Sequence, residues 1–103
     1  MKWLVPWYSL DDPSQEREGM ERELARELTQ GHELFGLPVR ALARRQDCDD
    51  VLFALEGSER VAVVHLTWSP NEKAPWPSTE LFASLDEFVV VRMQLDHDRF
   101  HYG

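Results

Sequence analysis

Apolar and polar positions alternate in three short segments in the middle of the chain. These segments span residues 39–45, 51–56 and 60–68, and a period of two is typical of strands with one buried face. Gly57 and Ser58 separate the second and third segments by the length of a hairpin turn. Because connections this short join antiparallel neighbours, the pattern predicts a three-stranded antiparallel meander.

Two further segments carry a helical pattern, one on each side of the predicted sheet. In residues 14–30, three apolar side chains lie four residues apart and form one stripe on a charged helix. Ser84 and Glu87 fit a capping box that opens a second helix, which extends to about Asp98. The expected fold is therefore α+β, in the order α-β-β-β-α, as a single domain over residues 1–103.

Strand alternation divides the predicted sheet into two faces. The first face is apolar throughout and is expected to meet both helices. Its members are Val39, Ala41, Ala43, Val51, Phe53, Leu55, Ala62, Val64, Leu66 and Trp68. The second face is mixed, yet too apolar to be left entirely in water. Its members are Arg40, Leu42, Arg44, Leu52, Ala54, Val61, Val63, His65 and Thr67. We expect either the aromatic N-terminal arm, as a fourth strand, or a second copy of the protein to cover part of it.

Composition and charge restrict the classes of partner. The 103 residues suffice for one core, and a hydrophobic fraction of 43% is typical of a globular domain. The formal net charge of −8 argues against nucleic acid and favours basic partners. No stretch approaches the roughly 20 apolar residues that span a bilayer. The single cysteine, Cys48, cannot form an internal disulfide, which is typical of a reducing compartment. A cytoplasmic protein, monomeric or homodimeric, is expected.

His65 is the first candidate for chemistry because it is a polar residue in a nearly all-apolar strand. With a carboxylate such as Asp50 or Glu72, it could act in a small hydrolase-like or metal-assisted enzyme. The alternative is a structural histidine, half-buried in the sheet and hydrogen-bonded to a neighbouring residue. The chain holds no Gly-x-Ser-x-Gly nucleophile motif, so no catalytic residue is assigned.

Two segments come into consideration as metal sites. Residues 47–50, which include Cys48, lack the spaced oxygen ligands of a calcium loop and are more typical of a turn. His97 and His101 lie four residues apart, but nothing downstream supplies a third ligand for zinc. The sequence therefore predicts no metal and no cofactor.

The proline-rich segment of residues 69–79 is the leading candidate for a binding site. It follows Trp68 and holds Trp76 between two prolines, and aromatic side chains on a stiff loop are typical anchors for peptide or protein partners. Glu72 and Glu80 flank this loop and favour a basic ligand. The candidate binding residues are Trp68, Trp76, His65, Glu72 and Glu80. The alternative is that both tryptophans close the edge of the core.

These patterns together predict a non-catalytic module that binds a protein or peptide partner, with a basic one favoured. Two alternatives stay open. One is the His65 enzyme described above. The other is an acidic, immunity-like antagonist that neutralises a basic partner by charge complementarity.

Most of the chain after the N-terminal arm resembles a group of small uncharacterised bacterial proteins. The resemblance is carried by Ala41-Leu-Ala-Arg-Arg-Gln-Asp-Cys-Asp-Asp-Val-Leu-Phe-Ala-Leu55, by Val61-Ala-Val-Val-His-Leu-Thr-Trp68, and by Trp76-Pro77 with Thr79. It implies a bacterial, stand-alone domain. No activity, cofactor or catalytic residue comes with it.

Overall fold

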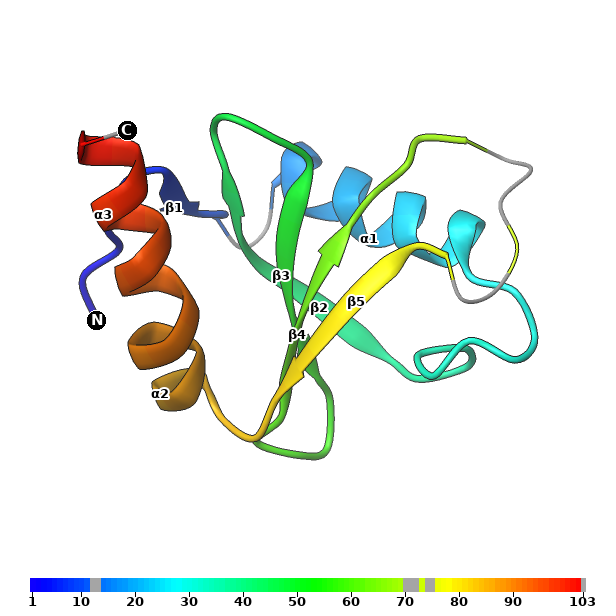
Figure 1. Cartoon of the computed structure of the whole chain (residues 1–103). Coiled ribbons are helices and arrows are strands. Elements are labelled where there is room, and N and C mark those ends of the chain that lie inside the picture. Colours follow the sequence, from blue (N-terminus) through cyan, green and yellow to red (C-terminus); the bar gives the residue numbers. More distant parts are fainter. Residues whose placement is uncertain (12–13, 70–72, 74–75, 103) are drawn as a thin grey trace.

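A five-stranded antiparallel sheet forms the centre of the computed structural model (Figure 1). The structure describes residues 1–11, 14–69, 73 and 76–102. The strands lie in sequence order across the sheet. They are β1 (Trp7–Ser9), β2 (Val39–Arg45), β3 (Asp50–Leu55), β4 (Val61–His65) and β5 (Ser78–Phe82). Helix α1 (Gln15–Glu27) follows β1, and a continuous C-terminal helix follows β5. Its parts are α2 (Leu85–Phe88), a π-helical stretch η1 (Val89–Met93) and α3 (Gln94–Tyr102).

The predicted order α-β-β-β-α with a three-stranded meander is wrong, because two more strands complete the sheet. The N-terminal arm supplies β1, which pairs antiparallel with β2. Strand β5 begins inside the segment predicted as a loop and pairs with β4, so that Ser78 lies opposite His65 and Phe82 opposite Val61. The neighbouring prolines favoured a loop locally. Pairing with the apolar strand β4 overrides that local signal.

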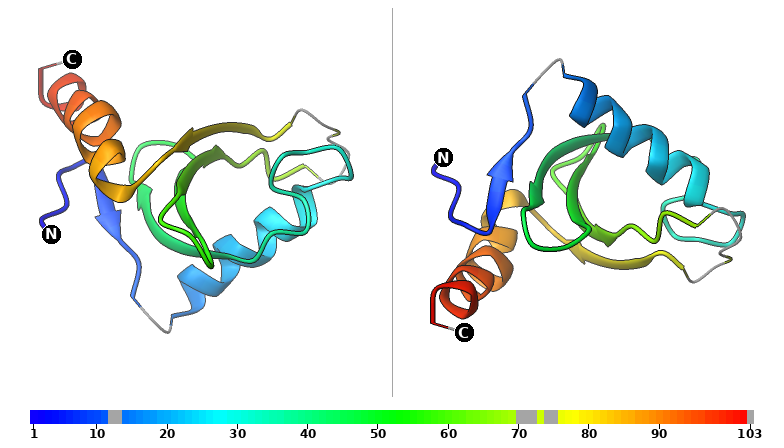
Figure 2. Two further views of the ribbon diagram at one scale, coloured as in Figure 1. Left: turned by 90° about the horizontal axis from the view of Figure 1, so that it is seen from below. Right: turned by 90° about the horizontal axis from the view of Figure 1, so that it is seen from above.

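The two helices pack on opposite faces of the sheet, and not on one face as predicted (Figure 2). Helix α1 covers a cluster that includes Leu24, Phe53 and Val64. The C-terminal helix covers a second cluster, in which Phe88 and Met93 pack on the other face. That face is buried at Leu52, Val61, Val63 and Phe82. Two apolar faces each need a cover, and each helix supplies one.

A β-bulge explains why the predicted faces fail in β2. The register shifts between Ala41 and Ala43, so Ala41 joins the α1 cluster and Ala43 joins the opposite one. The backbone N–H of Ala41 donates to a carboxylate oxygen of Glu21 on α1, at 2.8 Å. An extra residue in one strand moves the following side chains to the other face, and composition gave no sign of it.

The N-terminal arm covers part of the second face. Trp7 is buried, and its ring packs edge-on against Phe88 with centroids 5.1 Å apart. Trp3 packs against the same cluster. No helix within the described residues has the length and apolar character that crossing a membrane requires.

Candidate functional site

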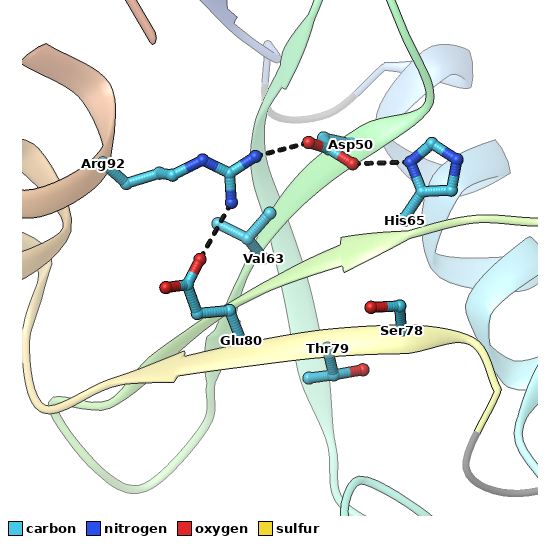
Figure 3. Close-up of a pocket in the computed structure, with 7 residues that line it drawn as sticks. All are labelled: Asp50, Val63, His65, Ser78, Thr79, Glu80 and Arg92. Carbon is cyan, nitrogen blue, oxygen red and sulfur yellow. Dashed lines mark hydrogen bonds and ion pairs between the residues drawn. The ribbon is translucent and has the colours of Figure 1, made fainter. Parts of the chain in front are cut away.

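A polar pocket of about 400 Å³ opens between the second face of the sheet and the C-terminal helix. Strands β3, β4 and β5 and the η1 stretch line it (Figure 3). Its polar residues include Asp50, His65, Ser78, Glu80 and Arg92. An open pocket with a few convergent polar groups is the usual place for a ligand.

Asp50, His65 and Ser78 form a row across three strands. Asp50 lies opposite His65, and His65 lies opposite Ser78. Directly opposed residues of antiparallel strands share a face, so register alone brings these three together. His65 Nδ1 is 2.7 Å from Asp50 Oδ1, and the structure shows no hydrogen bond between the side chains of His65 and Ser78.

The Asp50–His65 hydrogen bond defines which ring nitrogen a ligand can reach. Asp50 is buried, whereas the His65 side chain is 54% exposed. A carboxylate on Nδ1 places the proton there in the neutral ring, so Nε2 is the nitrogen with a free lone pair. The arrangement is suited to accepting a proton at Nε2, because an imidazole oriented by a carboxylate can serve as a general base.

Arg92 holds the other side of the pocket. Its guanidinium donates to Asp50 Oδ2 at 2.5 Å, to Glu80 Oε1 at 3.0 Å and to Asp96 Oδ2 at 2.9 Å. Burial disfavours the charge of Arg92, but the carboxylates of Asp96, Asp50 and Glu80 outweigh burial and raise the pKa of Arg92. Arg92 lies in the π-helical stretch, a local geometry frequent at functional sites.

The network continues from Asp96 to the N-terminal arm and to β2. Asp96 is buried and accepts the indole N–H of Trp7 at 2.9 Å. Arg45 lies 3.3 Å from the second oxygen of Asp96 and binds Asp47 through two hydrogen bonds of 2.8 and 2.7 Å. These bonds join the C-terminal helix, which carries Arg92, to strands β1 and β2.

Cys48 lies in the turn between β2 and β3, half-buried beside the pocket. Its sulfur, a carboxylate oxygen of Asp50 and a ring nitrogen of His65 all lie within 4.8 Å of one another. Burial raises the pKa of the Cys48 thiol, so the group is a neutral thiol and not an activated nucleophile.

A second hollow of about 260 Å³ lies beside the first. Trp76 lines it together with Glu33, Ser78 and Thr79. Ser78 and Thr79 also line the first pocket, so the two hollows flank the beginning of β5. Trp76 is 51% exposed, which gives a ligand access to its ring.

Trp68 is positioned by a buried glutamate of α1. Glu27 accepts the backbone N–H groups of Thr67 and Trp68, each at 2.8 Å, and the Thr67 hydroxyl at 3.0 Å. Trp68 has a φ of 57°, which ends the strand alternation and leaves the side chain 45% exposed. Its predicted place on the apolar face of the sheet is therefore wrong, because the chain turns at this residue.

The structure gathers some of the predicted binding residues and separates others. His65 and Glu80 line the polar pocket, and Trp76 lines the neighbouring hollow. Trp68 is absent from the described lining of both hollows. Glu72 lies outside the described residues.

Sequence reasoning missed Arg92 and His32. A charged side chain on an apolar helix stripe needs a partner, so the position of Arg92 among apolar neighbours was a usable signal. His32 is buried, with Nε2 2.9 Å from the carbonyl oxygen of Pro77 and Nδ1 accepting the N–H of Leu34 at 3.0 Å. It fastens the loop after α1 to the beginning of β5, and no sequence pattern signalled that contact.

The chain matches no protein-family model, no curated protein and no solved structure. The resemblance to small bacterial proteins therefore stays a prediction, and the function is argued from geometry.

Proposed function

We propose that the protein is a non-catalytic module that binds an extended, basic segment of a protein partner along the free edge of β5. The observation that carries the proposal is that, among the residues that the structure describes, β5 pairs with β4 on one side only and is flanked by two hollows. Strand addition to a sheet edge is a common mode of peptide recognition.

The hydrogen-bond pattern of the sheet shows which groups face this edge. At the two ends of the β3–β4 ladder, Leu55 N–H donates to the Arg60 carbonyl and Leu66 N–H donates to the Asp49 carbonyl. Bonded pairs alternate along antiparallel strands. Every second residue of β4, His65 among them, therefore turns its backbone groups towards β5.

The same alternation extends to β5. Because Ser78 lies opposite His65, Ser78 and Glu80 direct their backbone groups towards β4. Thr79 and Leu81 direct theirs to the free edge, where no backbone bond from another described element meets them. Such an edge is a template for another strand.

The two hollows suit the alternate side chains of an added strand. Successive side chains of a strand point to opposite faces of the sheet. One set would meet the pocket of His65 and Glu80, and the other set would meet the hollow of Trp76 and Glu33. Main-chain bonds would supply affinity, and the hollows would supply specificity.

Charge favours a basic segment. Glu33 and Glu80 are exposed beside β5, and the chain carries a formal net charge of −8. A lysine or arginine could also lie over the exposed Trp76 ring, since cations are attracted to aromatic faces. An acidic, immunity-like antagonist of a basic protein is one form that this proposal allows.

Peptide selection tests the proposal directly. We expect a library of random linear peptides, selected on the immobilised protein, to yield ligands with basic residues at alternate positions. Methylating single backbone nitrogens of a selected peptide should abolish binding at every second residue, because only alternate N–H groups face β5. The Glu80→Gln variant should weaken binding, whereas Glu59→Gln, with the same charge change in the β3–β4 turn, should not. Failure to enrich any peptide, or equal tolerance of methylation at all positions, would contradict strand addition.

The Asp50–His65 pair supports a second candidate, a small hydrolase-like enzyme. His65 is oriented by a buried carboxylate at 2.7 Å and opens to a pocket, as a general base requires. Hydrolysis of an activated ester such as p-nitrophenyl acetate should then fall in His65→Gln and persist in the control His97→Gln. Equal rates in both variants would exclude this role of His65.

A further inference from the structure

The side chains of Cys48, Asp50 and His65 converge at one corner of the polar pocket. Asp50 begins β3 and His65 ends β4, so strand pairing fixes these two relative to each other. Cys48 reaches the same point from the turn before β3. The three potential ligand atoms lie within 4.8 Å of one another.

We infer that Cys48, Asp50 and His65 bind a thiophilic divalent cation, with zinc as the best match. The inference stands apart from the peptide proposal, since it needs neither the β5 edge nor Trp76. A thiolate with an imidazole selects zinc over calcium or magnesium, which prefer oxygen ligands alone.

The distances fit a four-coordinate zinc ion after small movements. With ordinary zinc bond lengths, ligand atoms of a tetrahedral site lie about 3.4 to 3.6 Å apart. The separations of at most 4.8 Å therefore need a contraction on the order of 1 Å. The Asp50–His65 contact of 2.7 Å must widen, because the ion takes the place of the shared proton. The exposed His65 side chain and the Cys48 turn can both supply such movements.

The surrounding charges favour a cation despite the nearby arginines. Arg92 and Arg45 contribute two positive charges, and the carboxylates bound to them are Asp50, Glu80, Asp96 and Asp47. The network thus has an excess of negative charge. Arg92 holds the second oxygen of Asp50, and an outer hydrogen bond of that kind orients a ligating carboxylate.

Three protein ligands leave one position of a tetrahedral ion for water or another ligand. That number is typical of catalytic zinc sites, whereas structural sites use four protein ligands. Because the pocket is open beside His65, the fourth position would be accessible from solvent.

Cobalt and zinc titrations of the reduced protein test the site. Cobalt(II) should produce the near-ultraviolet charge-transfer band of a thiolate ligand and the visible bands of a four-coordinate ion. Zinc should displace cobalt with 1:1 stoichiometry. We expect Cys48→Ser to abolish the charge-transfer band and to weaken zinc binding at least about 100-fold.

Substitutions at two neighbouring aspartates distinguish a specific zinc site from general attraction of the ion to acidic groups. Asp50→Asn should weaken zinc binding at least about 10-fold, whereas Asp49→Asn removes the same charge one residue away and should leave it within about 3-fold. Circular dichroism of each variant verifies that it is folded. Absence of the thiolate band in the folded protein, or equal loss in Asp49→Asn and Asp50→Asn, would overturn the inference.

Discussion

Asp50 and His65 face each other directly across β3 and β4, and one hydrogen bond of 2.7 Å joins their side chains. The bond orients the imidazole and leaves its second nitrogen available on a side chain that is 54% exposed. It also places an exposed histidine over a buried carboxylate that Arg92 holds from the other side. The peptide, metal and hydrolase proposals all use this pocket, and they differ in the ligand that meets it.

Asp50 should contribute to stability as well as to ligand binding. The Asp50→Asn variant loses the negative charge of the carboxylate that is hydrogen-bonded to both Arg92 and His65. We therefore expect its free energy of unfolding to fall by about 2 kcal/mol. Urea denaturation with a chelator present measures this without a contribution from metal. Asp49→Asn, at a more exposed carboxylate, should change stability by less than about 0.5 kcal/mol. Equal stability of the two variants would contradict the described role of Asp50.

The Glu27 anchor predicts a loss of stability in acid. Burial alone would raise the pKa of Glu27, but the hydrogen bonds from Glu23, Thr67 and Trp68 outweigh it and lower the pKa. A lowered pKa in the folded state stabilises the protein above the unfolded pKa of about 4.3, and this contribution is lost as pH falls through the folded value. Glu27→Gln should cost about 2 kcal/mol at neutral pH and progressively less in acid.

The neighbouring Glu23 shifts in the opposite sense and supplies the control. Burial and the hydrogen bond to Glu27 raise its pKa, so its contribution is fully present below the unfolded value and is lost as pH rises through the folded one. Chemical denaturation of Glu23→Gln over a range of pH should therefore retain the acid sensitivity that Glu27→Gln lacks. Identical dependence of the unfolding free energy on pH in the two variants would show that the opposite pKa shifts of Glu23 and Glu27 are wrongly assigned.

Trp68 should tolerate glycine better than alanine. Its φ of 57° lies in the left-handed region, which costs a residue with a Cβ atom about 1 kcal/mol and costs glycine nothing. Thermal or urea unfolding should find Trp68→Gly more stable than Trp68→Ala. At Glu59, where φ is not positive, the same pair of substitutions should give the opposite order. The same order at both positions would argue against this backbone conformation.

Trp76 should matter for peptide binding and little for folding. Truncating an aromatic side chain that is a binding hot spot costs about 2 kcal/mol or more, so Trp76→Ala should weaken a selected peptide at least about 30-fold. Phe100 is also exposed but belongs to α3, and Phe100→Ala should leave affinity unchanged. Calorimetric titration of both variants measures the difference. Comparable losses would indicate a binding surface away from β5.

Local sequence patterns were enough to predict the three central strands. The alternation around Phe53 gave β3 to within one residue at each end, whereas β4 ends at His65, three residues before its predicted end at Trp68. Ser84 began the C-terminal helix where expected. The bulge at Ala43 and the strand beginning at Ser78 depend on pairing with a neighbour, which no local window contains.

The residues of the candidate site also fall into two groups: some were signalled by a local sequence pattern, and others are brought together only by packing. The histidine in an apolar strand drew attention to His65, and Asp50 was one of its expected partners. Arg92 lies 42 residues from Asp50 in sequence, so only the packing of the C-terminal helix reveals the contact. Cys48 and His65 meet because the turn before β3 lies beside the end of β4, and this nearness is invisible in ligand spacing.

Hydrogen exchange at the Thr79 and Leu81 amides, measured by NMR with and without a selected peptide, tests the central claim most directly. The claim that β5 receives a strand predicts fast exchange of both amides in the free protein and at least about 10-fold slower exchange in the complex, while the already paired amides of Ser78 and Glu80 change less. Thr79 and Leu81 amides that are already protected without peptide, or that stay fast when peptide is bound, would contradict it.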